Sequence, residues 1–324
     1  MITRTACCTS NVTDPYWNLA LERTLLETVP EGCCILYLWQ NANTVVIGRN
    51  QNAWRECRTA LLEEEGGKLA RRLSGGGAVY HDLGNLNFTF LMPSAEYDLP
   101  KQFSVISTAC EALGIRTELS GRNDLLADGR KFSGNAFYHH EGRSFHHGTI
   151  LISADMEKMG RYLMPAPAKM ESKGVKSVPA RVINLDSLCP GLTVGDMKSA
   201  MLNAFQRVYG CRTELIAPEE TDPERTELYA GRNRSYEWNY GRSMPFNAAL
   251  EDRFSWGDIR MEFDVSEGRI RNLTVYSDAM DASIAPILSD ALTGRKFSGG
   301  DLCAAVRGTD ILFREDLCAL LGTI

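Results

Sequence analysis

The spacing of apolar and polar residues predicts an alternation of helices and strands over the first third of the chain. Asp14-Pro15 has the pattern of a helix start, since aspartate caps the free N–H groups and proline fits the first turn. Trp17, Leu21 and Leu25 then follow at four-residue spacing. The elements predicted up to residue 113 are a helix from Asp14, strands over 35–39 and 44–47, and helices over 53–65 and 103–113.

The segment 71–91 interrupts this pattern with two arginines, a serine and three consecutive glycines. A run of glycines lets the backbone lie flat against another group, and backbone N–H and guanidinium groups hold anions. Residues 78–80 predict a short strand, 82–85 a turn and 87–91 a returning strand. The segment therefore predicts an anion-binding loop that enters a hairpin. The P-loop and dinucleotide-binding glycine patterns are missing from the sequence, so we expect a ligand on a sheet surface.

The middle of the chain predicts a three-stranded meander over 124–152, with turns at 127–130 and 139–143. A short helix is expected over 155–163. Thr193 caps a further helix whose apolar stripe we assign to the core rather than to a cofactor site, namely Val194, Met197, Met201, Phe205 and Val208.

Between 164 and 184 the sequence has little periodicity and an unusual charge. Lys169, Lys173, Lys176 and Arg181 oppose only Glu171, so this segment carries 4 − 1 = +3 in an otherwise acidic chain. Two interpretations stay open: a solvated loop, or a basic flap over an anionic ligand.

The last part of the chain changes character near residue 247. Residues 259–265 alternate strictly, 266–269 predict a turn, 270–276 a returning strand, and two helical segments follow. We expect a small α+β accessory domain over 247–324 after a larger domain over 1–246.

Composition narrows the class of protein. The 324 residues include 44% apolar and 23% charged residues, a balance that supports a large folded core. The net charge of −6 argues against nucleic-acid binding. No apolar run is long enough for a membrane span and no secretory pattern stands at the start. The ten cysteines form no Cys-x-x-Cys pair, which favours free thiols in the cytoplasm.

Lys131 is the first candidate for chemistry. It stands in Gly-Arg-Lys-Phe-Ser-Gly at a strand start, close in sequence to Asn123 and Asp124, where an ammonium group suits a carboxylate or phosphate oxygen. The same hexapeptide recurs at 294–299 between helical segments, and we interpret that copy as coincidence.

Four of the five histidines fall between His139 and His147. Neighbours on a strand point to opposite faces, so we expect no metal site from the two pairs. His147 is expected to shape a pocket. No serine or cysteine has the sequence setting of a nucleophile.

Several motifs stand in a fixed order along almost the whole chain: Thr44–Arg49, Arg71–Asp82 with Gly84-Asn85, Gly121–Leu125, Arg130–Gly134, His146–Thr149, Lys173–Leu185 and Trp256-Gly257. This combination resembles the lipoate–protein ligases, the adenylating type with a fused accessory domain. The resemblance implies an α+β fold, in which a mixed or antiparallel sheet with flanking helices forms a biotin/lipoate ligase catalytic domain, related to class II synthetases.

The resemblance also implies a reaction in two steps. Lipoate and Mg-ATP would give lipoyl-AMP and pyrophosphate, and the lipoyl group would then pass to a lysine of a carrier domain. The implied carriers are the E2 subunits of 2-oxoacid dehydrogenases and the H protein of glycine cleavage. We expect a monomer. Whether lipoate or octanoate is preferred is left open.

Site residues carried over from the family fall into two groups. The implied ATP-binding residues are Arg72, Gly77, Ala78, Val79, Tyr80 and Lys131. The lipoate-binding candidates are Lys131, Leu73, Gly75, Gly76 and His147, and no protein metal ligand is expected. Lys131 has the catalytic role, as a fixed cation between two anionic substrates.

Two alternatives remain. One is an ATP-independent lipoyl or octanoyl transferase that works through a cysteine thioester; Cys189 is the cysteine nearest the later motifs. The other is a regulatory protein that binds a lipoyl or biotinyl nucleotide without catalysis, although no basic winged-helix segment is evident.

Overall fold

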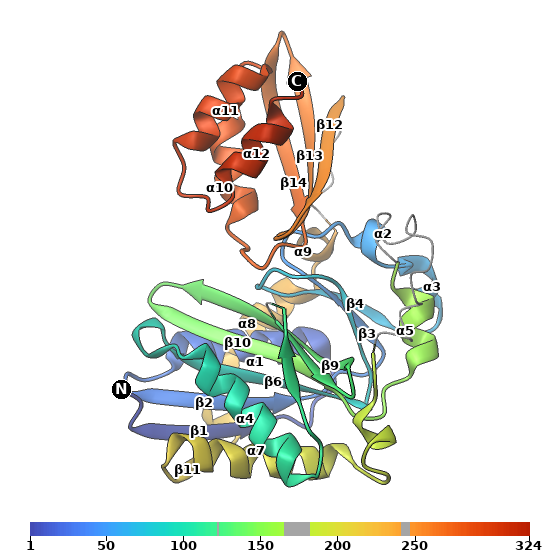
Figure 1. Cartoon of the computed structure of the whole chain (residues 1–324), viewed down its shortest axis with the longest axis vertical. Coiled ribbons are helices and arrows are strands. Elements are labelled where there is room, and N and C mark those ends of the chain that lie inside the picture. The colour runs from blue at the N-terminus through green and yellow to red at the C-terminus, as the bar shows by residue number, and fades with distance from the viewer. Residues whose placement is uncertain (122, 165–181, 241–246) are drawn as a thin grey trace.

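A computed structural model describes residues 1–121, 123–164, 182–240 and 247–324. Figure 1 shows a large layered part below and a smaller part above that carries the C-terminus. Most of the basic segment predicted between 164 and 184 lies outside the described residues, as does the connection over 241–246. None of the described helices combines the length and apolar character needed to cross a bilayer.

The large part is built on an eight-stranded sheet in the order β11-β1-β2-β6-β10-β9-β8-β7. β1 runs parallel to both β2 and β11, and the other pairs are antiparallel. This confirms the predicted α+β class with a mixed sheet. The strands are β1 (Arg4–Thr9), β2 (Cys33–Trp39), β6 (Asn85–Pro93), β7 (Glu118–Ser120), β8 (Asp124–Ala127), β9 (Arg130–His140), β10 (Arg143–Leu151) and β11 (Thr213–Ile216).

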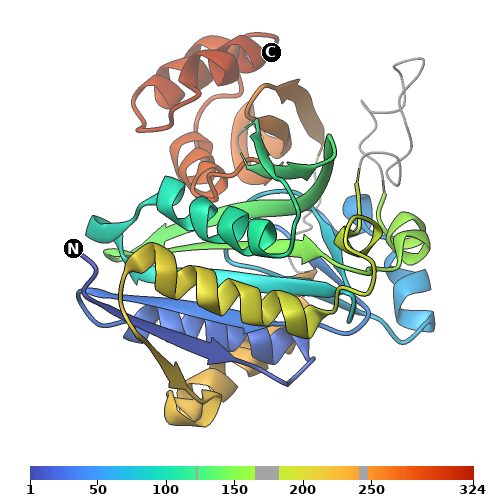
Figure 2. The same cartoon turned by 60° about the horizontal axis from the view of Figure 1, so that its bottom comes forward.

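Helices cover both faces of this sheet, and the alternation of side chains along β2 explains why. Leu36 and Leu38 point to one face and Tyr37 and Trp39 to the other, and all four are buried. Because both faces are apolar, each needs a covering layer. Figure 2 shows α4 (Leu99–Ala112) and α7 (Val194–Tyr209) side by side on one face. The other face packs on α1 (Pro15–Thr28), with α8 (Pro223–Arg234) against it and α9 (Tyr236–Asn239) beyond.

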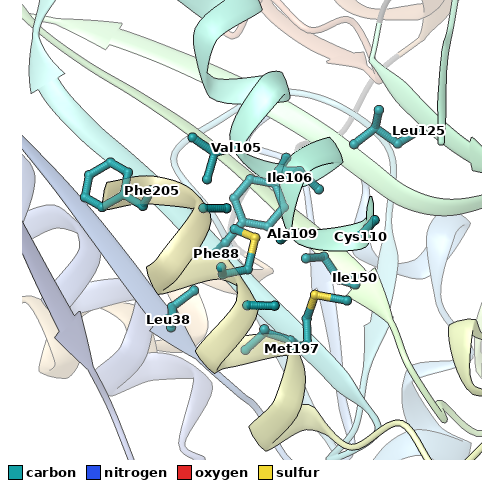
Figure 3. Packing of buried hydrophobic residues seen from close by; sticks show 14 of the residues in the cluster. Leu38, Phe88, Val105, Ile106, Ala109, Cys110, Leu125, Ile150, Met197 and Phe205 are labelled. Carbon is teal, nitrogen blue, oxygen red and sulfur yellow. The ribbon is translucent and has the colours of Figure 1, made fainter. Parts of the chain in front are cut away.

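The predicted helices in this part have the expected caps. The Asp14 side chain accepts a hydrogen bond at the start of α1, and Thr193 forms a capping box with Asp196 at the start of α7. The stripe on α7 lies in the core as predicted, and Figure 3 shows Met197 and Phe205 among the buried side chains around Phe88. The meander β8-β9-β10 is confirmed, and so is α5 (Met156–Tyr162), which Asp155 caps.

The predicted hairpin over 78–91 is wrong. β5 (Val79–His81) pairs with β3 (Thr44–Ile47) in a separate three-stranded sheet, β4-β3-β5, which also contains β4 (Lys68–Arg71). β6 lies instead between β2 and β10. All nine residues of β6 are buried, which requires neighbours on both edges and cover on both faces. The turn at 82–85 thus carries the chain from one sheet to the other.

The predicted helix over 53–65 is also interrupted. It forms two short helices, α2 (Ala53–Glu56) and α3 (Thr59–Glu64), because Cys57 is extended and forms an isolated bridge with Leu163. The thiol of Cys57 is buried at that break.

The C-terminal part has its own antiparallel sheet and its own hydrophobic core. Its strands are β12 (Ala248–Phe254), β13 (Gly257–Ser266) and β14 (Arg269–Ser277), and its helices are α10 (Ile284–Leu292), α11 (Gly299–Arg307) and α12 (Arg314–Leu321). Figure 1 shows the three helices packed on one face of the sheet. Two helical segments were expected and three are present, and β12 adds a strand to the predicted hairpin.

Candidate active site

The glycine loop, residues 72–78, connects β4 to β5 and is held from within by Arg72. The Arg72 guanidinium donates to Ser74 Oγ at 3.0 Å, to the Gly75 carbonyl at 2.7 Å and to the Gly77 carbonyl at 2.8 Å. Burial lowers the pKa of Arg72 to about 10, so the group is still charged at neutral pH. Arg72 therefore fixes the shape of the loop through its fork of donors.

Arg71 does not face a ligand, contrary to the expectation of two guanidinium groups around an anion. Its side chain is buried and donates to backbone carbonyls from two segments: Gly48, Arg49 and Gln51 after β3, and Trp238 and Asn239 in α9. Arg71 thus joins the segment after β3 and α9 to the strand that leads into the glycine loop.

Close packing explains two of the glycines. A Cβ at Gly48 would lie 2.1 Å from the Gly76 carbonyl oxygen, and a Cβ at Gly75 would lie 2.2 Å from the Ala279 carbonyl oxygen. Gly76 has a φ of +86° and donates its N–H to the same Ala279 carbonyl at 3.0 Å. The loop is therefore packed between the turn after β3 and the segment that follows β14 in the C-terminal part.

Two cavities meet beside this loop. The smaller has a volume of about 230 Å³ and the larger about 820 Å³. The larger one also reaches the β12–β14 sheet, at Glu251, Asp258 and Arg260. Six residues line both cavities and so mark their junction: Gly77, Ala78, Val79, Lys131, Gly134 and Thr149.

Lys131 lies at this junction with its ammonium group held in place. Its Nζ is 2.7 Å from Asp124 Oδ1, and the two side chains are 37% and 35% exposed. A Cβ at Gly134 would lie 3.0 Å from Lys131 Nζ, so the glycine leaves room for the lysine side chain. The arrangement puts one fixed positive charge between the two cavities.

The structure brings together most of the predicted site residues. Gly77, Ala78, Val79 and Lys131 line both cavities; Arg72, Gly76 and His147 line the small one; Tyr80 lines the large one. Leu73 and Gly75 line neither. Leu73 packs with Val79 against the core around α1, and Gly75 contacts the C-terminal part.

His147 connects the loop to a residue that sequence reasoning missed. Its Nε2 is 2.7 Å from Ser74 Oγ and its Nδ1 is 2.8 Å from Glu22 Oε1. Glu22 is almost fully buried and also accepts from Thr89 Oγ1 at 2.7 Å. The signal was the spacing of Glu22, which stands three residues from both Leu19 and Leu25 and so lies on the apolar side of α1. Four further residues line the small cavity: Trp39, His81, Asn87 and Met280. Trp39 and His81 stand in the segments that carry the family resemblance but were given no site role, and Asn87 and Met280 had no signal of their own.

His146 is a core residue. Its ring nitrogens bond to Gln102 Oε1 and Asn135 Oδ1, and burial lowers its pKa well below the usual value. Among the described residues no group of three or more His, Cys, Asp or Glu side chains could hold a metal ion.

Comparisons with known proteins agree with this geometry. Residues 14–206 match the family model of the lipoyl protein ligase A/B catalytic domain, and residues 243–316 match that of the bacterial lipoate protein ligase C-terminus. The chain is similar over 99% of its length to all of Plasmodium falciparum LipL1, solved in complex with lipoate, with 26% identity and a TM-score of 0.87.

Two further solved structures share the fold over about three quarters of the chain. Lipoate-protein ligase A bound with ATP has 24% identity and a TM-score of 0.62, over 74% of this chain and 99% of that one. The ligase of a bipartite archaeal system from Thermoplasma acidophilum has 23% identity and a TM-score of 0.64, over 76% of this chain and 100% of that one. Because the catalytic-domain model matches more than half of the residues of this chain, the chain belongs to the lipoate–protein ligase family.

Proposed function

We propose that this protein is an ATP-dependent lipoate–protein ligase. The lipoate carboxylate attacks the α-phosphorus of ATP, pyrophosphate leaves, and lipoyl-AMP forms. The ε-amine of a carrier lysine then attacks the acyl carbonyl, which forms the amide and releases AMP. The observation that carries this proposal is the position of Lys131 at the junction of the two cavities.

The sizes and linings of the cavities support an assignment of substrates. At about 820 Å³ the larger cavity is within the usual range of small-molecule sites, roughly 300–1,000 Å³, and suits the nucleotide. The smaller cavity includes Leu19, Trp39 and Val46 in its walls, which suits an acyl chain. The carboxylate and the α-phosphate would then meet at the shared residues.

Lys131 supplies the electrostatic part of the mechanism. Two anions repel each other as they approach, and charge grows on the phosphate oxygens in the transition state. A cation fixed beforehand, here by Asp124, stabilises that charge without reorganisation. The rest of the acceleration comes from holding the two substrates in line.

We assign Arg72, Gly77, Ala78, Val79 and Tyr80 to the ATP site, with Arg72 acting through the shape of the loop. Gly76 and His147 line the acyl site. Leu73 and Gly75 do not line it, but their packing against the core and the C-terminal part holds the loop that does. Magnesium that arrives with ATP needs only one or two protein carboxylates. Asp124 lines the nucleotide cavity and would serve, and the ion would offset phosphate charge.

We further propose a catalytic domain over 1–246 and an accessory domain over 247–324, supported by the separate sheet and core of the second part. The acceptor is a lipoyl carrier domain, such as an E2 subunit or the glycine-cleavage H protein. The Thermoplasma system pairs a ligase of this fold with its E2 lipoyl domain. A cytoplasmic, monomeric enzyme stays a prediction.

The competing function is transfer through a cysteine thioester. No cysteine stands among the described residues that line the two cavities. Burial also raises the pKa of Cys7 to about 11 and that of Cys57 to about 12, which opposes thiolate formation.

The test is incubation of an apo lipoyl domain with the enzyme, lipoate and Mg-ATP, followed by mass spectrometry of the domain. We expect a lipoyl adduct only when ATP is present. An adduct formed without ATP from an acyl carrier donor would favour the cysteine transferase instead.

A further inference from the structure

The small cavity has a direction that follows from the strand register. Thr149 lies opposite Asn87, and Asn87 lies opposite Trp39, so the three side chains form a row across β10, β6 and β2. Two strand spacings of about 4.8 Å give this row a length of about 10 Å. Thr149 belongs to the junction with Lys131, whereas Asn87 and Trp39 line the small cavity alone. An acyl chain with its carboxylate at Lys131 therefore ends near Asn87 and Trp39.

A histidine is also at this distal end. His81 lines the small cavity, is only 3% exposed, and lies edge-on to Trp39 with 6.1 Å between ring centroids. It comes from β5, in the other sheet, so the distal end is closed by residues from both sheets of the catalytic part.

The hydrogen bonds behind His81 determine its tautomer. Asn18 Nδ2 donates to the carbonyls of Val12 and Gln40, each at 2.9 Å, which fixes the orientation of that amide. The same nitrogen faces Asn41 Oδ1 at 3.0 Å, so Asn41 turns its Nδ2 toward His81 Nδ1, at 3.1 Å. His81 Nδ1 is then an acceptor, and the proton of the neutral ring is on Nε2.

Two N–H donors at the distal end have no hydrogen-bond partner in the part of the chain that the structure describes. One is His81 Nε2. The other is Asn87 Nδ2 in the present orientation of the Asn85–Asn87 amide pair: Asn87 is 1% exposed, its Oδ1 accepts from Asn85 Nδ2 at 2.9 Å, and Asn85 Oδ1, which does not line the cavity, is likewise without a partner. Buried donors without partners are costly, and they would stay unpaired beside a purely alkyl chain end.

We propose that His81 and Asn87 are specificity-determining residues that recognise the sulfur atoms at the end of the lipoyl chain. Divalent sulfur is a weak hydrogen-bond acceptor, whereas the end of an octanoyl chain accepts nothing. The enzyme therefore prefers lipoate to octanoate. The expected preference in kcat/KM is about tenfold, the size of effect that about 1.4 kcal/mol produces. This inference rests on the proposed function of the same site.

The test compares lipoate, octanoate and 8-hydroxyoctanoate as substrates for pyrophosphate release, and as ligands of the full-length enzyme in calorimetry. The wild-type enzyme should use octanoate least well, because both other acids carry an acceptor near the chain end. Asn87→Val and His81→Leu should each reduce the preference for lipoate over octanoate toward equality. His81→Gln, which restores an N–H at that position, should recover part of it.

Leu19→Val is the matched control, since it changes the shape of the same cavity without changing its polar groups. It should alter lipoate and octanoate use by similar factors. An unchanged lipoate-to-octanoate ratio in active Asn87→Val and His81→Leu enzymes, or a wild-type enzyme that prefers octanoate, overturns the inference. If none of the three acids gives pyrophosphate, the proposed function fails. The order of their affinities in calorimetry still decides whether His81 and Asn87 distinguish lipoate from octanoate.

Discussion

Replacement of Lys131 by alanine should strongly slow adenylate formation while leaving the fold intact. The Lys131–Asp124 pair is 2.7 Å apart but about one-third exposed on each side, so it should contribute no more than about 1 kcal/mol to folding. The same ammonium faces two substrate anions. At about 4 Å and an effective dielectric constant of about 20, one such interaction is worth roughly 4 kcal/mol.

Loss of one preorganised group in the transition state typically costs about 3–4 kcal/mol, or roughly a hundredfold to a thousandfold in rate. The chain contains its own matched control. Lys296 stands in the same hexapeptide, but it is exposed, and its backbone bridges to Arg269 in the C-terminal part. Lys296→Ala should change stability by less than about 0.5 kcal/mol and leave the rate unchanged.

The assay is lipoate-dependent pyrophosphate release for both variants, together with the thermal midpoint of each. Wild-type rates for Lys131→Ala would refute the reasoning, because no other fixed cation has been assigned to the junction. A folded but inactive Lys296→Ala enzyme would refute it as well, since it would put the adenylation site in the C-terminal part.

Three further predictions concern stability. Arg71→Met leaves five backbone carbonyls without their buried donor and should lower the free energy of unfolding by at least about 3 kcal/mol in urea titrations; an unchanged midpoint would contradict this role. Gly75→Ala should lower both the thermal midpoint and the activity, because the new Cβ clashes with the Ala279 carbonyl oxygen. Gly160→Ala is the control: no atom lies within 4 Å of its Cβ, so the thermal midpoint and the activity should not fall. Burial lowers the pKa of His81 to about 3 and that of His146 well below its usual value. As the pH falls through about 6.5, these two histidines therefore take up protons in the unfolded chain but not in the folded one. Stability should therefore fall by about 1.4 kcal/mol per histidine between pH 7.5 and 5.5, and urea titrations of His146→Gln should show a smaller fall.

What could be predicted from the sequence depended on how local the determining contacts are. α1, α7 and the meander were predicted because caps, turns and apolar periods lie within the element itself. The hairpin at 78–91 failed because β5 and β6 each take partners far along the chain, and turn residues do not distinguish a hairpin from a crossing between sheets. The break at Cys57 likewise depends on a distant residue, Leu163.

The site shows the same limit. Lys131 could be singled out from its neighbours in sequence, but its position between two cavities could not. His81 and Asn87 look like ordinary strand residues until their hydrogen bonds are traced. Arg71 looked like an anion ligand, because nothing local reveals that carbonyls from after β3 and from α9 surround it.

The parallel pairing of β1 with β11 has a consequence for folding while the chain is still being synthesised on the ribosome. About 200 residues separate the two strands, so one edge of β1 is open until β11 has emerged. At about 5–20 residues per second this takes roughly 10–40 s. During that interval the edge at Ala6, Cys7 and Cys8 can pair with other nascent chains. Aggregation during expression should thus depend on elongation speed and chaperone supply, even for variants whose finished fold is as stable as the parent.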